Sequence, residues 1–264
     1  EHSNFREMQK AFIYFDTVPK KLIKKKTEIA AKCEGKWRKA RTQKNFNLVK
    51  KEMSELIKIV REEGKFLSEV YECSKYDALL KCYERSFSTK QIEVYFEDLK
   101  SFINQKYDTI VNNQIGSKCA NVNISEKEQF ELSKFFMKKL GFDFRRGRLD
   151  KSAHPFCGGS VGDVRITTRI NNENNFSAFE AVMHETGHAL YEQNLPKNWS
   201  YQPAGKSGGM ALHESQSLFI EMQIMKSKEF INYLTKILNQ KFLKQKPKVN
   251  FNNLYNKFNK VEKN

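Results

Sequence analysis

Two histidines and a glutamate stand together in the segment AVMHETGHALYEQ, where His184, Glu185 and His188 form the pattern H-E-x-x-H. On a helix, residues four apart lie on one face, so both imidazoles can reach a single ion. Neutral imidazole suits zinc, and Glu185 lies one step around the helix, in the position of a general base for a water molecule that the metal activates. The pattern therefore predicts metal-assisted hydrolysis.

A catalytic zinc site also needs a third protein ligand and one open position. The segment MALHESQSLF, residues 210–219, offers His213 and Glu214. Adjacent residues on a helix diverge by about 100°, so only one of the two faces the ion, and spacing alone does not decide which. The alternative interpretation is that two surface histidines and an unrelated helix happen to occur in one chain.

The elements that must position these residues are mostly helical. Apolar residues recur at steps of three and four and predict an amphipathic helix; they are Phe46, Val49, Met53, Leu56 and Val60. Ser88 with Gln91, and Ser125 with Glu128, fit the capping box that begins a helix. Gly141 follows the second of these helices, where a left-handed residue commonly ends the element.

The middle of the chain brings glycines, a proline and then a β-branched run that predicts a half-exposed strand. In this run Val164, Ile166, Thr168 and Ile170 alternate with Arg165, Thr167 and Arg169. Helices are predicted over about 177–194 and 208–226, and the Lys- and Asn-rich tail from 240 is predicted to be a poorly anchored helix or coil. The expected fold class is mainly α, with a small antiparallel β-sheet beside the H-E-x-x-H helix.

We expect one partial domain over residues 1–264 in three sections. These are a helical region at 1–145, a metal-site region at 146–227 and a helical or disordered tail at 228–264. No linker rich in Gly, Ser or Pro divides the chain. No stretch approaches the roughly 18 apolar residues of a membrane span, so no membrane partner is expected.

The formal net charge of +16 admits two interpretations. Clustered Lys and Arg would bind a polyanion such as nucleic acid by releasing counterions. The lysines are instead spread over many predicted helix faces, and no nucleic-acid module signature is evident. The charge is therefore interpreted as a solvated, soluble surface.

The cysteines are odd in number and form no C-x-x-C pattern; they are Cys33, Cys73, Cys82, Cys119 and Cys157. This argues against a disulfide framework and a zinc ribbon and predicts a cytoplasmic protein. The first residues, EHSNFREMQK, lack a signal pattern and an initiator Met. A processed chain or a fragment is therefore expected.

Six segments carry a resemblance to a known family: CEGKWRKAR, YDALLKCYE, LGFDFRRGRLDKSAHPFCGG, DVRITTR, HETGHALYEQNLP and HESQSLFIEMQ. Together they resemble the Taq-type thermostable metallocarboxypeptidases, which are zinc-dependent gluzincins with a helical, neurolysin-like fold. The resemblance implies that His184, His188 and Glu214 bind the metal and that Glu185 is the catalytic base. It thereby favours Glu214 over His213 as the third ligand.

The resemblance also places the H-P-F motif around His154, and the D-x-R-x-T-T motif that includes Thr167 and Thr168, in the same cleft. From the residues alone, Asp163 and Arg165 fit equally well as an ion pair at a strand edge. An edge strand beside the metal could bind a peptide by β-augmentation.

Three further polar residues surround the expected ligands. His154, before a proline in a loop, is interpreted as structural. His213 is expected to orient Glu214 or to contact substrate. Gln216, in H-E-S-Q, is a candidate of the same kind.

The predicted function is release of C-terminal amino acids from peptides by a zinc carboxypeptidase, and the ligands would also accept cobalt or manganese. Members of the family are about twice as long, and the later I-R-x-x-A-D and G-x-x-Q-D-x-H-W motifs are absent here. We therefore expect a separate C-terminal half to complete the cleft, and exposed apolar faces that favour self-association, including homodimers. The alternatives are a metal-binding but catalytically incomplete remnant and a basic nucleic-acid-binding helical protein.

Overall fold

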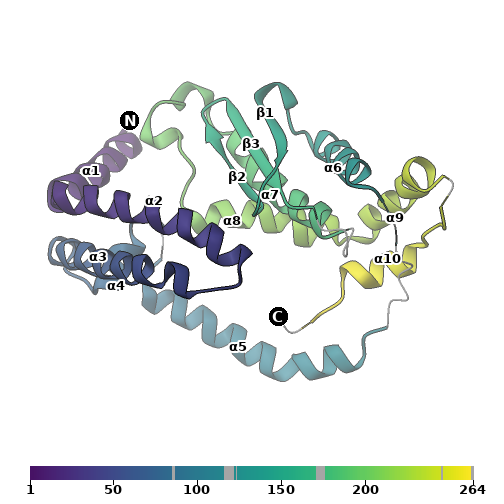
Figure 1. Cartoon of the computed structure of the whole chain (residues 1–264), viewed down its shortest axis with the longest axis horizontal. Coiled ribbons are helices and arrows are strands. Elements are labelled where there is room, and N and C mark those ends of the chain that lie inside the picture. The colour runs from purple at the N-terminus through teal and green to yellow at the C-terminus, as the bar shows by residue number, and fades with distance from the viewer. Residues whose placement is uncertain (85–86, 116–121, 123, 171–175, 245, 263–264) are drawn as a thin grey trace. The chain divides into compact units, whose positions relative to one another are not determined.

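The computed structural model describes residues 1–84, 87–115, 122, 124–170, 176–244 and 246–262, and its chain forms two compact units (Figure 1). The first unit comprises residues 1–94 with 202–204, and the second comprises 95–201 with 205–264. The three sections expected from the sequence stay a prediction. None of the described helices is both long and apolar enough to cross a membrane.

The first unit is helical. Its elements are α1 (His2–Thr17), α2 (Lys20–Thr42), α3 (Asn47–Tyr71), α4 (Lys75–Leu80) and the beginning of α5 (Thr89–Asn112). The predicted apolar stripe lies on α3, where Val49 is buried, whereas Phe46 precedes the helix and is exposed. The main core of this unit is built from Val18, Leu22, Ile29, Ile59, Leu67 and Ala78.

The second unit holds the sheet and the H-E-x-x-H helix. After the end of α5 its elements are α6 (Glu126–Leu140), the 3-10 turn η1 (Phe144–Arg146), β1 (Gly147–Lys151), β2 (Phe156–Ser160), β3 (Asp163–Thr168), α7 (Ser177–Gln193), the 3-10 turn η2 (Lys197–Trp199), α8 (Met210–Leu218), the π-helical segment η4 (Phe219–Met225), α9 (Lys228–Ile237), the π-helical segment η5 (Leu238–Phe242) and α10 (Phe251–Phe258). The 3-10 turn η3 (Pro203–Gly205), whose first two residues belong to the first unit, precedes α8 in the chain.

Both predicted capping boxes are confirmed. The backbone N–H of Ser125 donates to the Glu128 carboxylate at 2.6 Å, and the Glu128 N–H donates to the Ser125 hydroxyl at 3.3 Å. Ser88 and Gln91 exchange the same pair of bonds at 2.9 and 3.4 Å. Gly141 ends α6 with a φ of 103°, in the left-handed region that glycine adopts without strain.

The sheet is mixed, which corrects the expectation of an antiparallel one. β2 and β3 form an antiparallel hairpin, whereas β1 pairs with β3 in parallel, so the strand order is β1-β3-β2. The reason is that β3, on returning from the hairpin, enters the central position between the two earlier strands. The predicted alternation holds in β3, because Val164, Ile166 and Thr168 are buried while Arg165 is exposed.

Helix α7 lies against the sheet, with α6, α8 and η4 packed around it (Figure 1). The structure describes all of α7, and every side chain along it is buried or half-buried. Val182 and Ala189 pack with Leu149, Val164 and Ile166 of the sheet. This packing holds the helix that carries His184, Glu185 and His188 in a fixed orientation.

The tail after residue 240 is anchored, contrary to the expectation. Leu254 and Phe258 of α10 are buried, and the Phe258 ring contacts Phe176 edge-on with centroids 5.4 Å apart. The Asn259 side chain donates to the carbonyl of Lys226 at 3.2 Å. The tail therefore belongs to the same hydrophobic core as α7.

The cysteines give no sign of a disulfide in the described part of the chain, where Cys33, Cys73, Cys82 and Cys157 are free thiols. Cys119 lies outside the described residues.

Asp143 ties the turn η1 to the end of α7. Its carboxylate accepts hydrogen bonds from Arg145 and Arg146, and its backbone N–H donates to the Gln193 side chain at 2.9 Å. Hydrogen bonds from Arg145, supported by Arg146, lower the pKa of Asp143 to about 2.

The depressed pKa predicts a loss of stability in acid. Since an unfolded Asp has a pKa of ~3.9, the ionised carboxylate stabilises the fold above that pH, and the contribution disappears as pH falls toward about 2. Asp143→Asn should lower the melting temperature at pH 6, and the difference from the parent should shrink as pH falls. Thermal unfolding at several pH values checks this. A difference independent of pH would contradict it.

Candidate metal centre

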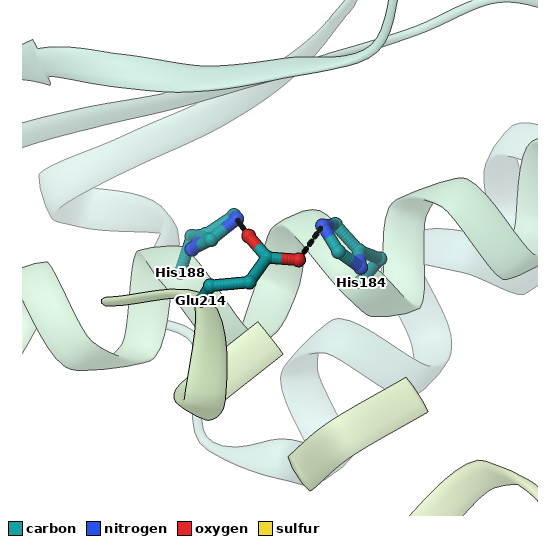
Figure 2. A group of neighbouring side chains, drawn as sticks. All are labelled: His184, His188 and Glu214. Atoms are coloured by element: carbon teal, nitrogen blue, oxygen red, sulfur yellow. Dashed lines mark ion pairs between the residues drawn. The ribbon is translucent and has the colours of Figure 1, made fainter. Parts of the chain in front are cut away.

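Three donors from two helices come together in the second unit: His184 and His188 from α7 and Glu214 from α8 (Figure 2). One oxygen of the Glu214 carboxylate lies 3.6 Å from Nε2 of His184, and the other lies 3.3 Å from Nε2 of His188. One donor atom from each of the three residues can be chosen so that all lie within 4.8 Å of one another. This arrangement has the compactness of a metal ligand set.

The donor set fits a divalent metal. For tetrahedral zinc, bond lengths of ~2.0–2.1 Å place neighbouring donors roughly 3.3 Å apart. The two separations between carboxylate and imidazole here are 3.3 and 3.6 Å. Two imidazole nitrogens and one carboxylate oxygen also form an open set that leaves a fourth position free.

Hydrogen bonds at Nδ1 orient both imidazoles so that Nε2 faces Glu214. Nδ1 of His184 lies 2.7 Å from a carboxylate oxygen of Glu221, in η4. Nδ1 of His188 lies 3.1 Å from the backbone carbonyl oxygen of His213. An Nδ1–H that donates to oxygen leaves the Nε2 lone pair free, which is the tautomer that a metal requires.

The two histidines differ in proton affinity. The hydrogen bond with Glu221 raises the pKa of His184 despite burial, with support from the charge of Glu214. Burial lowers the pKa of His188, and the neighbouring His213 and His184 rings act in the same direction. The lowered pKa of His188 favours the neutral form that binds a metal, whereas the raised pKa of His184 favours the protonated form that does not.

Gly187 allows α7 and α8 to approach closely between the two histidines. A Cβ added there would lie 2.3 Å from the carbonyl oxygen of Gln216 and 2.5 Å from Cα of Ser217. Both are backbone atoms, so neither can move away as a flexible side chain could. The absence of a side chain at this position thus brings Glu214 within reach of the histidines.

Gly187→Ala is accordingly expected to destabilise the fold by about 1–3 kcal/mol, the usual cost of overpacking. Metal affinity should also fall, because α8 and Glu214 must shift. Chemical unfolding with and without metal checks both effects. Gly35→Ala in α2, where an added Cβ meets nothing within 4 Å, is the matched control. Unchanged stability of the Gly187 variant would contradict the close approach.

Glu185 lies between the two histidines in sequence and is buried at 8% exposure. Burial raises the pKa of its carboxyl, the charge of Glu214 adds to the rise, and His184 opposes it. The backbone N–H of Cys157, in β2, donates to the carboxylate and favours the ionised form. Strand β2 therefore holds in place the group expected to act as a base.

His213 packs behind the ligand His188. The two rings are stacked with centroids 4.5 Å apart, and Nε2 of His213 lies 2.9 Å from an oxygen of Glu192. A hollow of about 320 Å³ opens beside these residues; it is lined by Cys157, Gly158, Gly159, Ser160, Val161, Val164, Glu192 and His213. His213 thus supports His188 through its carbonyl and its ring rather than joining the ligand set.

The D-x-R-x-T-T motif is divided between the two faces of the sheet. Thr168 is buried, and its hydroxyl donates to the carbonyl of Ala178 in α7 at 3.3 Å. Asp163 and Arg165 form an exposed ion pair at 2.6 Å on the other face. Thr167 shares that face. Among the polar residues of the motif, Thr168 is therefore the one with a described hydrogen bond to the H-E-x-x-H helix.

His154 and Gln216 lie outside the ligand set. The side chain of His154 is exposed, and its carbonyl oxygen accepts hydrogen bonds from Thr167, at 3.2 Å, and from Ser152. The Gln216 side chain donates to the Ser215 hydroxyl at 3.2 Å, while its backbone carbonyl faces Gly187.

Glu221 was not predicted from the sequence, although its carboxylate lies 2.7 Å from Nδ1 of His184 and orients that ring. Outer carboxylates of this kind typically affect metal affinity by about 10–100-fold. Glu221→Gln should therefore weaken metal binding by about that factor while one metal still binds per chain. Competition with a chelator of known affinity measures the change. Glu229→Gln, at an exposed position on α9, is the control, and equal affinities would contradict the role.

Known proteins that are similar to this chain are metallopeptidases and carboxypeptidases. The sequence profile of the family described as carboxypeptidase Taq (M32) metallopeptidase matches residues 1–264. Carboxypeptidase 1 of Bacillus subtilis is 33% identical over 216 residues, which are 81% of this chain and 43% of that protein. Thermostable carboxypeptidase 1 of Pyrococcus furiosus is 30% identical over 230 residues, or 84% and 45% of the two chains.

The solved structure of Trypanosoma cruzi metallocarboxypeptidase 1 superposes with a TM-score of 0.83 at 33% identity. The match covers 99% of this chain and 53% of that one. The chain thus spans slightly under half the length of the two curated relatives.

Proposed function

Because this chain belongs to the carboxypeptidase Taq (M32) metallopeptidase family, we propose that it supplies the metal centre of a zinc carboxypeptidase that releases C-terminal amino acids from peptides. The observation that carries the proposal is the convergence of His184, His188 and Glu214, with both Nε2 atoms facing the carboxylate. Zinc suits this donor set, and cobalt and manganese are compatible with it. The family itself implies a divalent metal.

The metal's contribution when bound is positive charge, which acidifies water and polarises a carbonyl oxygen. Glu185 has the position of the base that accepts a proton from the attacking water and later delivers it to the departing amine. Its raised pKa favours the first step, because a carboxylate whose pKa lies nearer neutrality is a stronger base toward the attacking water. The Cys157 N–H keeps the carboxylate oriented through both steps.

Strand β2 is the proposed platform for the peptide. It is an edge strand, paired on one side with β3, and it carries Cys157 beside Glu185. A peptide lying along its other edge would pair backbone with backbone, which fits an enzyme that acts on many sequences. The hollow at Glu192 and His213 borders the same strand.

The relatives' remaining half lies outside the matched region, and we expect full turnover to require its counterpart. That counterpart could belong to the same polypeptide or be added as a second one. The loss of even one oxyanion donor typically costs about 100-fold or more in rate. We accordingly expect the 264 residues alone to bind metal well and to hydrolyse slowly.

The test measures metal content and peptidase activity on one purified sample. The substrate is an N-blocked dipeptide with a free C-terminus, and its C-terminal amide is the control. About one zinc per chain, with release only from the free acid, would support the proposal. Absence of bound metal after equilibration with zinc would overturn the proposal. Bound zinc without release of the C-terminal amino acid would limit the proposed function of these residues to metal binding.

A further inference from the structure

The first unit contains a pocket of about 370 Å³ that the proposed peptidase chemistry does not use. It lies between α1, the end of α3 and the residues that follow α4. Its lining consists of Lys10, Ala11, Tyr14, Phe15, Tyr71, Lys81 and Cys82. We call it the α1 pocket. Small-molecule sites typically have volumes of roughly 300–1,000 Å³, so one ring-bearing molecule would fit.

Aromatic rings form the walls of the α1 pocket. Tyr14 and Phe15 meet edge to face, with centroids 5.3 Å apart and planes at 89°. Tyr71 stands on the side of the pocket formed by α3. Rings set at right angles present both a face and an edge to a guest, which is the arrangement that another aromatic ring prefers.

One acidic group beside these walls, Glu63, is paired with a lysine. Glu63 is buried at 3% exposure, and both of its carboxylate oxygens accept hydrogen bonds from Lys26 at 2.7 Å. The Tyr14 hydroxyl donates to one of them at 2.7 Å. Glu63 therefore has its own cation, and the charge of Lys26 opposes that of the Glu63 carboxylate at Cys82 in the α1 pocket.

The remaining charge on the lining is positive. Lys81 lies with Nζ 4.7 Å from the centre of the Tyr71 ring and makes no ion pair with a described residue, although Asp77 lies close enough to interact electrostatically. Lys10, which also lines the pocket, pairs with Glu7 at 2.8 Å. A lysine ammonium has three N–H donors, so a contact with one ring leaves donors free to meet an anion.

We propose that the α1 pocket binds a small aromatic anion, that is, a flat ring bearing a carboxylate or a phosphate. The ring would lie among Tyr14, Phe15 and Tyr71, and the anionic group would meet the Lys81 ammonium, with Lys10 nearby. This proposal stands apart from the metal centre and does not depend on peptidase activity.

The alkylation rate of Cys82 reports on binding, because its thiol lines the pocket and a bound ligand would shield it. The 264-residue protein is alkylated with iodoacetamide, and the rate at Cys82 is followed by peptide mass. Cys73, which is outside the lining, is the internal reference. The probes are 2-naphthoate, adenosine monophosphate and the uncharged 2-naphthamide, and calorimetry gives their dissociation constants.

We expect at least one of the two anions to slow alkylation of Cys82 selectively and to bind about 10-fold or more tightly than 2-naphthamide. Comparing the two anions distinguishes a carboxylate from a nucleotide phosphate as the preferred group. Lys81→Gln should weaken the binding of that anion about 10-fold or more, and Lys81→Arg should restore the affinity. Lys75 is an exposed lysine outside the lining, so Lys75→Gln should leave both the affinity for the anion and the alkylation rate of Cys82 unchanged.

Two results would overturn the proposal. The first is that 2-naphthoate, adenosine monophosphate and the uncharged 2-naphthamide all bind with equal affinity. The pocket would then make only nonspecific apolar contacts and would not recognise an anion. The second is absence of selective protection by any probe at millimolar concentration, with the circular dichroism and melting temperature of the Lys81 variants matching the parent.

Discussion

Replacing Glu185 with glutamine is expected to abolish hydrolysis while metal binding is kept. The amide has nearly the same size as the carboxyl and can still accept the hydrogen bond from the Cys157 N–H, but it cannot accept a proton from water. General acid–base catalysis contributes about 100- to 10,000-fold in rate, so the rate should fall by at least about 100-fold. Release of the C-terminal residue from the blocked dipeptide measures it.

The metal content of the Glu185 variant is determined on the same sample. Glu229→Gln, on the exposed face of α9, is the matched control and should keep full activity and metal. Hydrolysis within a few-fold of the parent would remove Glu185 from the role of base. A loss of metal together with activity would instead make Glu185 a structural part of the ligand set.

Replacing His188 with alanine is expected to have the largest effect on metal binding. The change removes one of three donors and leaves Glu214 facing a single imidazole. Because loss of an outer partner alone typically costs about 10–100-fold in affinity, loss of a direct donor should cost more than about 100-fold. The parent should gain about 2.7 kcal/mol of stability at a free zinc concentration 100 times its dissociation constant. The variant should gain almost none.

Thermal unfolding with and without zinc checks this prediction. His154→Ala is the matched control, since His154 is an exposed histidine outside the ligand set and its loss should leave the response to zinc intact. If both variants respond to zinc as the parent does, the metal is held elsewhere.

The sequence predicted the half of the site that lies on one helix. His184 and His188 share a face because helical geometry fixes residues four apart, whatever surrounds them. Glu214 followed from the family resemblance, since the spacing left His213 as an equal choice. Glu221 was missed because its approach to His184 depends on the π-helical segment η4, which local propensity does not reveal.

The sequence likewise predicted local features of the fold but not the pairing of distant segments. Helix caps such as the Ser125 box are local and could be predicted from four residues. The parallel pairing of β1 with β3 joins segments separated by a whole strand, so no local pattern indicates it. The tail carries an amphipathic helical pattern, because Phe251, Leu254 and Phe258 lie three and four residues apart. The many Lys and Asn residues around them obscured this pattern.

Helix α7 has no exposed side chain along its length, all of which the structure describes, whereas α5 has no buried one among its described residues. Exchanges along α5 therefore remove little buried packing from the described part of the fold. On α7 every exchange must be accommodated by the sheet, by a neighbouring helix or by the ligand set. Most exchanges along α7 are therefore expected to cost stability, including those at positions that bear no candidate ligand.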